Sequence, residues 1–441
     1  MKFLVLKYWG NLRSSFWFLP SAMAAGAAAL AFGAIAFDRA VLTERFGNVG
    51  WAYAGGAEGA SAVLQTIAGS MITIAGVVFS LTLIALSLAS SQLGPRVLRN
   101  FMRDTTNQLV LGTFVATFLY CLLVLRSIVR TGDVFVPHLS VTIGVGFALA
   151  SLGVLIFFIH HVSVSIQADR MVARIGGELL RAVDRLYPDA LSPDDAPPGK
   201  GRPDAAVPDE FDQEARVIGS PDDGYVLLID TDALTRLAEE EEAILRLERR
   251  VGEYVVSGAP LVSIWPGSRL TGDVEDRAGS AFVVGSQRAP GQDFEFTVIQ
   301  LVEIAVRALS PGVNDPFTAI AAVDRLGSAL CRLAQRGSPP AAQFDDEHHL
   351  RVVGRPLTFP EVIDTAFNQI REYGRSSTAV TMRLLETLAT IAGFARRPED
   401  RAAIRRHADM IARGARDGLP EVEDHRAVGI QRDTVMRILE Q

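Results

Sequence analysis

Long apolar stretches dominate the first 168 residues of the chain, and they set its fold class. Four stretches of 21 to 37 residues contain no Asp, Glu, Lys or Arg. Each reaches the roughly 20 residues that a helix needs to cross the hydrocarbon core of a bilayer. We therefore predict an integral membrane protein with four transmembrane helices, at about residues 16–37, 62–93, 106–127 and 138–163.

The remaining residues follow the patterns of a folded α+β domain. Residues 169–187 keep one apolar face and are predicted to continue the last span as a cytoplasmic helix, which completes a transmembrane domain over residues 1–187. Residues 188–214 contain six prolines and six aspartates, which is typical of a disordered linker. Short β-rich runs over residues 215–285 predict a small barrel or sandwich, and residues 286–441 are predicted to form a helical cytoplasmic domain.

Capping signals mark several of the predicted helices. Within the β-rich region, residues 232–242 have helical spacing, with Asp232 as the expected cap. Residues 293–309 form a predicted amphipathic helix that opens with acidic residues. The next helix is expected to begin at Pro316 with Asp315 as its N-cap, because proline suits the first helical position.

Charge is distributed unevenly along the chain and predicts its orientation. Residues 1–168 contain ten Lys/Arg against five Asp/Glu, whereas the remainder contains 33 against 45. Basic residues concentrate before span 1, between spans 2 and 3 and after span 4, which predicts that both termini lie in the cytoplasm. One alternative is that span 1 is a cleaved signal peptide, with residues 34–36 as the cleavage site.

Span 2 contains the most informative pattern in the sequence. Six hydroxyl residues follow one another at offsets of 4, 3, 7, 7 and 4, so they share one stripe of the helix. Val77 and Ile84 interrupt this stripe, and Gly69 and Gly76 stand beside it. The stripe supplies our candidate pore-lining residues, which are Thr66, Ser70, Thr73, Val77, Ser80, Ile84, Ser87 and Ser91.

Two interpretations of this stripe are open. In the functional one, the hydroxyls line a water-filled path at the axis of an oligomer, and the two apolar residues form constrictions. In the other, the hydroxyls bond to carbonyls one turn back or to a neighbouring helix, as is common in packed membrane helices.

Three arginines follow the Gly94-Pro95 pair that ends span 2. Arg96, Arg99 and Arg103 alternate with apolar residues in a short amphipathic segment. They are candidates for an inner pore mouth that concentrates anions, or for anchors on lipid headgroups.

A polar group in the C-terminal half is a second candidate site. It comprises Arg288, Asp293, Arg307, Asn314 and Asp315. These residues could form a ligand or metal cluster, although helix capping and salt bridges explain each of them as well. We expect no bound metal and no cofactor.

Several function classes are disfavoured by the sequence. It contains no phosphate-binding Gly-rich Lys motif, no nucleophile elbow, no His-Glu-x-x-His and no Cys-x-x-Cys, so we do not expect an enzyme. The acidic C-terminal part argues against nucleic acid as a partner. Two cysteines, Cys121 and Cys331, provide no disulfide framework.

Three segments carry a family resemblance. Residues 67–80, residues 90–104 and the run Arg-Ala-Leu-Ser-Pro-Gly-Val-Asn-Asp-Pro at residues 307–316 resemble the bacterial predicted membrane protein family catalogued as domain of unknown function 2254. The likeness covers almost the whole chain, although Arg288-Ala289 stands where the family pattern has Arg-Thr. The resemblance implies a bacterial inner-membrane protein and no assigned activity.

Together these features lead to one functional prediction and one rival. We expect a homo-oligomeric ion channel or pore-forming transport protein, with the lipid bilayer, other copies of itself and inorganic ions as partners, regulated by its cytoplasmic domain. The alternative is a non-conducting membrane scaffold or sensor whose tail binds a protein or small ligand. A scaffold would bury the span 2 stripe against the other spans of its own chain.

Overall fold

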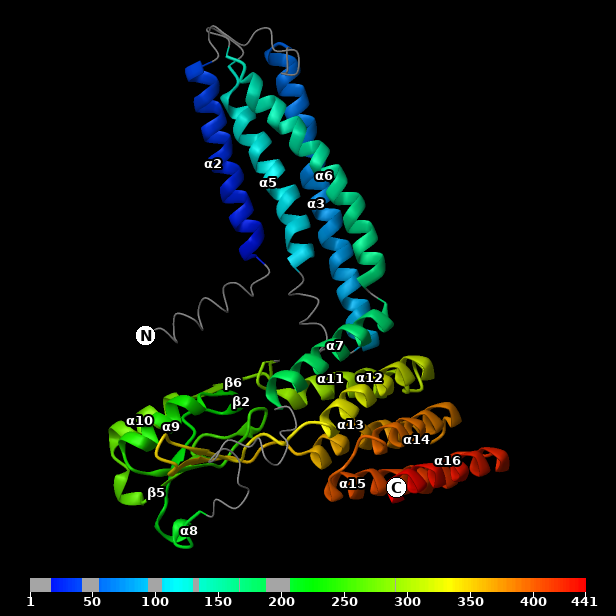
Figure 1. The fold of residues 1–441 in the computed structure, drawn as a ribbon. Helices are drawn as coiled ribbons and strands as arrows, with labels where there is room; N and C mark the ends of the chain where they lie inside the picture. The colour runs from blue at the N-terminus through cyan, green and yellow to red at the C-terminus, as the bar shows by residue number, and fades with distance from the viewer. Residues whose placement is uncertain are drawn as a thin grey trace. The chain divides into compact units, whose positions relative to one another are not determined.

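The chain divides into two compact units, residues 1–170 and 171–441. The structure is a computed structural model that describes residues 17–41, 55–93, 105–129, 135–165, 167–187, 207–289 and 291–441. Each unit has its own core and is described separately below (Figure 1).

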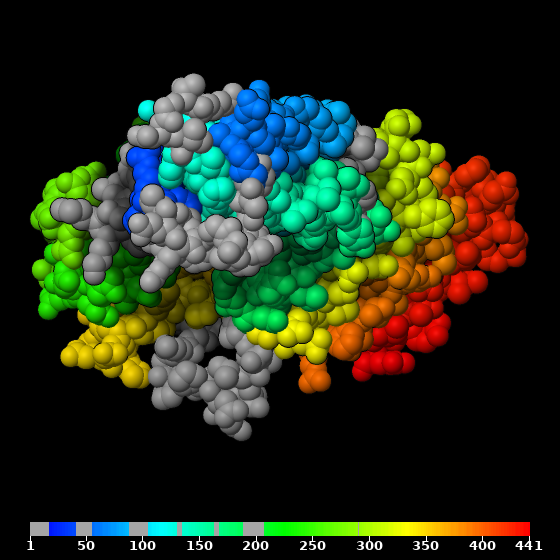
Figure 2. Space-filling view, turned by 90° about the horizontal axis from the view of Figure 1, so that it is seen from above, coloured from blue at the N-terminus to red at the C-terminus, as the bar shows by residue number. Residues whose placement is uncertain are grey.

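The described residues of the N-terminal unit form a bundle of four long helices, which confirms a helix at each of the four predicted spans. They are α2 (Phe18–Val41), α3 (Ala57–Leu93), α5 (Thr105–Ser127) and α6 (His138–Ser165). All four are long and apolar enough to cross a membrane. Helix α5 packs against the other three, and α2 and α3 lie on either side of it (Figure 1). In the view from above, α3 forms one outer side of the bundle (Figure 2).

Hydrogen bonds between helices add to the apolar packing of this bundle. The Thr117 and Ser151 hydroxyl oxygens of α5 and α6 lie 3.1 Å apart, and the Tyr120 hydroxyl donates to the Ser140 carbonyl at 3.0 Å. Tyr120 also packs edge-on against Phe147 at a centroid distance of 5.1 Å. Because lipid offers no hydrogen-bond partners, such satisfied polar pairs fix which helix faces meet.

The C-terminal unit combines two open sheets with a set of packed helices. Its first helix, α7 (Ala168–Leu186), is a separate element from α6 and packs into this unit through buried residues such as Ile175 and Leu179. The strands gather at one end of the unit and α11 to α16 at the other (Figure 1). No closed barrel forms among the described strands, because both sheets end in edge strands.

The β-rich part contains short strands and a helix near the predicted residues 232–242, together with short helical segments that were not predicted. Its elements are α8 (Phe211–Glu214), β1 (Arg216–Gly219), β2 (Gly224–Ile229), α9 (Thr231–Glu240), β3 (Ile244–Leu247), β4 (Tyr254–Val255), β5 (Pro260–Trp265), a 3-10 turn η1 (Gly267–Arg269), α10 (Gly272–Ser280) and β6 (Phe282–Gly285). The predicted cap of α9 was wrong: Asp230, not Asp232, accepts the bond from Ala233 N at 2.9 Å. The side chain two residues earlier is the one that reaches the free amides of the first turn.

Two later strands complete the larger sheet and cross the predicted boundary at residue 285. The sheets have the orders β1-β5-β3-β8-β7 and β4-β2-β6. Strands β7 (Ala342–Phe344) and β8 (Leu350–Val353) come from the region predicted to be helical, and β8 pairs in parallel with β3. The β-rich segment is therefore not closed off from the rest of the unit. Its core includes Val226, Leu245, Val262 and Val352.

Six helices that pack against one another make up most of residues 291–441. These are α11 (Phe294–Ala308), α12 (Pro316–Ala334), α13 (Phe359–Gly374), α14 (Thr378–Ala392), α15 (Pro398–Gly418) and α16 (Val422–Glu440). Asp293 and Asp315 cap α11 and α12 as N-caps, and Pro316 occupies the first turn of α12, which confirms these predicted starts. Their apolar stripes meet in a continuous core that includes Leu301, Leu326 and Leu385.

Candidate functional site

The predicted hydroxyl stripe of α3 lies on the surface of the bundle. Thr66, Ser70, Thr73, Ser80 and Ser87 are all exposed, and none of them is covered by another described helix of the chain. Val77 and Ile84, the two apolar members, are 54% and 65% exposed. The described part of the chain therefore does not use the stripe for packing. The side chain of Ser91 lies outside the described residues.

The opposite face of α3 provides its packing surface. Buried residues recur at the same seven-residue period, on the side that faces α5 and α6, and they are Ala60, Leu64, Ala68, Met71, Ala75, Val78 and Ala85. Helix α3 therefore has two stripes of the same period, one apolar and covered, the other hydroxyl-rich and open.

Four hydroxyls of the open stripe, those of Thr66, Ser70, Thr73 and Ser80, are satisfied by their own helix. Thr66 donates to the Ala62 carbonyl at 2.7 Å, and Ser80 donates to the Gly76 carbonyl at 2.9 Å. Ser70 and Thr73 make the same bond to the residue four positions earlier. Each hydroxyl proton is thereby occupied, while the oxygen lone pairs remain free to accept from water or to contact a cation.

Two glycines beside the stripe have open space around them, as do Gly26, Gly33, Gly146 and Gly153 elsewhere in the bundle. A Cβ at Gly69 or Gly76 would meet nothing within 4 Å. At Gly112 it would lie 2.5 Å from the Met23 sulfur, and at Gly144 it would lie 3.1 Å from Leu64 Cδ2. Close helix contact therefore explains Gly112 and Gly144, whereas nothing in the described part of the chain explains Gly69 and Gly76. Small residues of this kind let the backbone of another helix approach.

Arg96, Arg99 and Arg103, the predicted inner-mouth or headgroup-binding residues, lie outside the described residues.

The predicted polar cluster of the C-terminal unit is only partly brought together. Arg288 donates two bonds of 2.7 Å to the buried Asp293 carboxylate and a third, of 3.1 Å, to Glu295. Asp293 in turn caps α11 through Phe296 N. Arg288 and Asp293 therefore form a structural ion pair, in which both carboxylate oxygens of Asp293 accept hydrogen bonds.

The other three members of the predicted cluster lie at the far end of α11. Helix α11 has 15 residues, about 22 Å at 1.5 Å per residue, between Asp293 and the turn that holds Asn314 and Asp315. Arg307 lies in the last turn of α11. Asp315 accepts from Thr318 Oγ1 at 2.6 Å, and this bond lowers the pKa of the Asp315 carboxyl. The five residues therefore do not form one site, because the helix separates the two groups.

Sequence reasoning missed the buried Asp38 of the bundle. Its carboxylate accepts from Ser140 Oγ at 2.6 Å, Ser140 N at 2.9 Å and Leu139 N at 3.2 Å, so α2 caps the N-terminus of α6. In the sequence, Asp38 is merely the first charge after an apolar stretch. A link across about 100 residues has no local signal.

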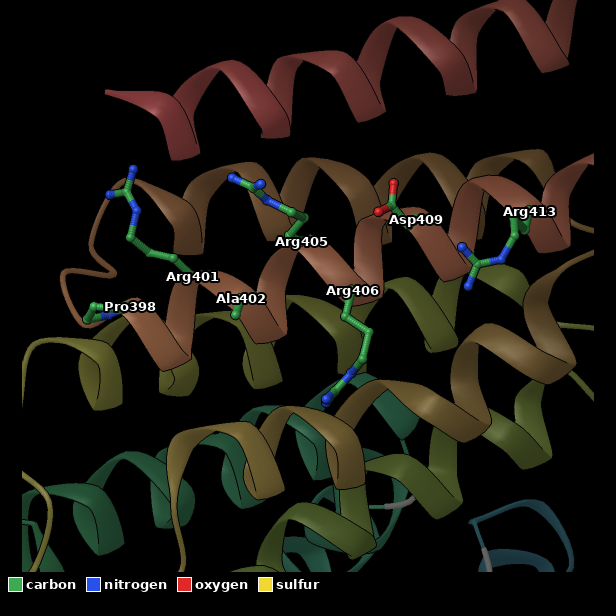
Figure 3. Close-up of a pocket in the computed structure, with 7 residues that line it drawn as sticks. All are labelled: Pro398, Arg401, Ala402, Arg405, Arg406, Asp409 and Arg413. Carbon is green, nitrogen blue, oxygen red and sulfur yellow. The ribbon is translucent and has the colours of Figure 1, made fainter.

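An arginine-lined hollow on α15 was also missed. It has a volume of about 630 Å³ and is lined by Pro398, Arg401, Ala402, Arg405, Arg406, Asp409 and Arg413. The side chains do not converge on one point: Arg406 turns away from Arg405 and contacts Asp364 at 2.5 Å (Figure 3). Asp409 is paired with Arg432 at 2.8 Å. Arg405 and Arg413 have no ion-pair partner among the described residues, and their eight-residue spacing, close to two helical turns, was the signal available.

Comparison with known proteins places the chain among membrane proteins of one family. The family model described as "Predicted membrane protein (DUF2254)" matches residues 13–390. Uncharacterized proteins of Mycobacterium bovis and Mycobacterium tuberculosis are each 33% identical over 378 residues, which cover 84% of this chain and 70% of the relative. No solved structure matches the chain.

Proposed function

The chain belongs to the DUF2254 family of predicted membrane proteins, and we propose that it is a homo-oligomeric pore whose path is lined by the hydroxyl stripe of α3. The observation that carries this proposal is the exposure of that stripe. Thr66, Thr73 and Ser80 lie on the side of α3 that no other described helix covers. In a ring of identical chains, the same face of each α3 would line the symmetry axis.

The chemistry of the stripe suits a path for small ions. Hydroxyl oxygens whose protons are already bonded to the helix present lone pairs, which replace part of the water shell of a cation. Val77 and Ile84 stand between the hydroxyls as exposed apolar residues, and rings of such residues form constrictions that gate by excluding water. Gly69 and Gly76, at the edge of the stripe, supply a surface for the α3 of a neighbouring chain.

A non-conducting assembly is the second candidate, and the internal hydroxyl bonds favour it. Because Thr66, Ser70, Thr73 and Ser80 already bond to their own helix, the stripe is also tolerated against lipid or a partner helix. Such an assembly would use α3 as a scaffold contact. Like the pore, this assembly would be a homo-oligomer, but it would conduct no ions.

Reconstitution into liposomes separates the two. Purified protein is assayed for cation and anion flux, together with its mass in detergent. Ser80→Leu and Ser87→Leu are expected to abolish flux while the oligomer is retained. Thr113→Leu is the matched control, because the Thr113 hydroxyl makes the same kind of bond, 2.8 Å to the Leu109 carbonyl, on α5 instead of α3. Unchanged flux in both serine variants would remove α3 from the path, and a monomer without flux would refute both candidates.

A further inference from the structure

Helix α7 has an arginine face that the proposed pore does not use. Arg170, Arg174, Arg181 and Arg185 follow at offsets of 4, 7 and 4, so they form one stripe, and all four are exposed. The opposite face of α7 is buried in the C-terminal unit. There Gly176 faces the side-chain stem of Arg325, and Leu179 lies against the apolar residues of α11 and α12.

No ion pair neutralises the charges of this face in the described part of the unit. Among the described residues, none of the four arginines pairs with a carboxylate. Arg174 donates to the Met171 sulfur at 2.8 Å, and Arg185 donates to the Gly291 carbonyl at 2.6 Å. The nearby Asp184 is already engaged by Arg332 in the last turn of α12, at 2.5 Å, and by Arg336 just after that helix, at 3.0 Å. The face is therefore a positively charged strip without a carboxylate partner among the residues that the structure describes.

Chain connectivity fixes where this strip begins. Helix α7 starts at Ala168, three residues after α6 ends at Ser165, and the apolar window of α6 ends at Val162. Because an extended chain covers at most about 3.6 Å per residue, the first turn of α7 begins within about 11 Å of the end of that helix. Arg170 is thus held close to the lipid headgroups by covalent connection alone.

We propose that the arginine face of α7 binds the anionic phospholipid headgroups of the membrane that the bundle crosses. Each basic residue near an anionic surface strengthens attachment about fivefold. The apolar face of α7 is occupied by the core of its own unit, so the helix cannot bury that face in the acyl region as amphipathic membrane helices do. The attachment is therefore electrostatic and sensitive to salt, and it goes beyond the proposed pore.

A fluorescent probe on this face tests the proposal in the full-length protein. Gly177 lies within the arginine stripe, and a Cβ there meets only Arg181 Nη1 within 4 Å, at 3.5 Å. Gly177→Cys, in a Cys331→Ser background, is labelled with an environment-sensitive dye. The protein is then reconstituted into phosphatidylcholine vesicles with or without phosphatidylglycerol. A nitroxide quencher is attached to the lipid headgroup.

Strong quenching is expected only in the vesicles that contain phosphatidylglycerol. Raising the salt from about 0.1 M to about 1 M should reduce it, because the screening length falls from about 10 Å to about 3 Å. The combined variant Arg170→Gln, Arg174→Gln and Arg181→Gln should quench no more than wild type does in neutral vesicles. Equal quenching in both vesicle types, or quenching that the triple variant leaves unchanged, would overturn the proposal.

A matched control distinguishes this face from basic surface in general. Arg405, Arg413 and Arg416 of α15 are likewise exposed and have no carboxylate partner among the described residues. Their combined change to glutamine removes the same charge from a helix that is not tied to a span. It should leave the quenching at position 177 unaltered. An equal loss in this control would contradict a specific role for α7.

Discussion

Asp38 of α2 accepts a hydrogen bond of 2.6 Å from Ser140 Oγ at the start of α6, although 102 residues separate the two. The same carboxylate accepts the backbone N–H of Ser140, so it acts as an N-cap supplied by another helix. The aspartate is 2% exposed. The first span is therefore part of the bundle, and its removal as a signal peptide would leave α6 without this cap.

Asp38→Ala is expected to destabilise the bundle. The change leaves two N–H groups and one hydroxyl without their acceptor, and the loss of a buried acceptor of this kind costs about 1–3 kcal/mol. Thermal unfolding of the purified protein in detergent measures the effect as a lower Tm. Glu58→Ala is the control, because Glu58 is exposed in the first turn of α3. Equal Tm values for the two variants would contradict a capping role.

Gly76→Val should separate folding from assembly. Nothing lies within 4 Å of a Cβ at this position, so the single chain can accept the side chain, whereas a closely packed neighbouring α3 cannot. We expect an unchanged Tm and a smaller mass in detergent. Gly112→Val provides the contrast, because its Cβ would collide with Met23 and Pro20 inside the bundle. An intact oligomer in Gly76→Val would exclude this face from the contact.

Gly252→Ala tests how much the ion pair between Arg288 and Asp293 contributes to stability. Gly252 has a φ of +93°, and a Cβ there would lie 2.5 Å from Arg288 Nη2 and 2.8 Å from the Asp293 carboxylate. Backbone strain and the displacement of the ion pair should together cost about 2–4 kcal/mol. Gly258→Ala has a similar φ of +80° but open space around it, so it should cost only about 1 kcal/mol. Chemical denaturation of both variants measures the difference.

The buried His407 is expected to make the stability of the C-terminal unit sensitive to acid. Burial lowers the pKa of this imidazole below its usual value of 6.5, although its Nε2 lies 2.8 Å from the Asp364 carboxylate, and Arg406 and Arg371 add to the lowering. Below pH 6.5 the unfolded chain binds a proton that the folded one resists. Stability should therefore fall as the pH drops through this value and stay level above it.

His407→Gln should remove this component of the pH dependence. Measuring Tm between about pH 5 and pH 8 compares the slopes, since this range brackets the ordinary histidine pKa. The control is His425→Gln on α16, whose ring nitrogen lies 2.9 Å from the Leu419 carbonyl. If the acid slope of wild type persists in the His407 variant, another group is responsible.

Local patterns were sufficient for most elements of this protein. The strand β2 and the cap Asp315 could be predicted because alternation and capping depend on neighbours within a few residues. The cap of α9 was missed by two residues, since two aspartates competed and the path of the chain into the helix selected one. Strand β8 was missed because its partner β3 lies about 100 residues earlier, and no local feature reports a parallel pairing.

The features of the candidate sites likewise divide into those that the local sequence determines and those that depend on tertiary contacts. The sequence alone determined the membrane class, the four spans and the period that gathers the hydroxyls of α3 on one stripe, because these follow from hydropathy and helix geometry. Only the tertiary structure decided which side of α3 is covered, that Arg288 and Asp293 lie apart from Asp315, and that Asp38 meets Ser140. A period states which residues share a face, whereas the partner of that face depends on contacts between segments far apart in the chain.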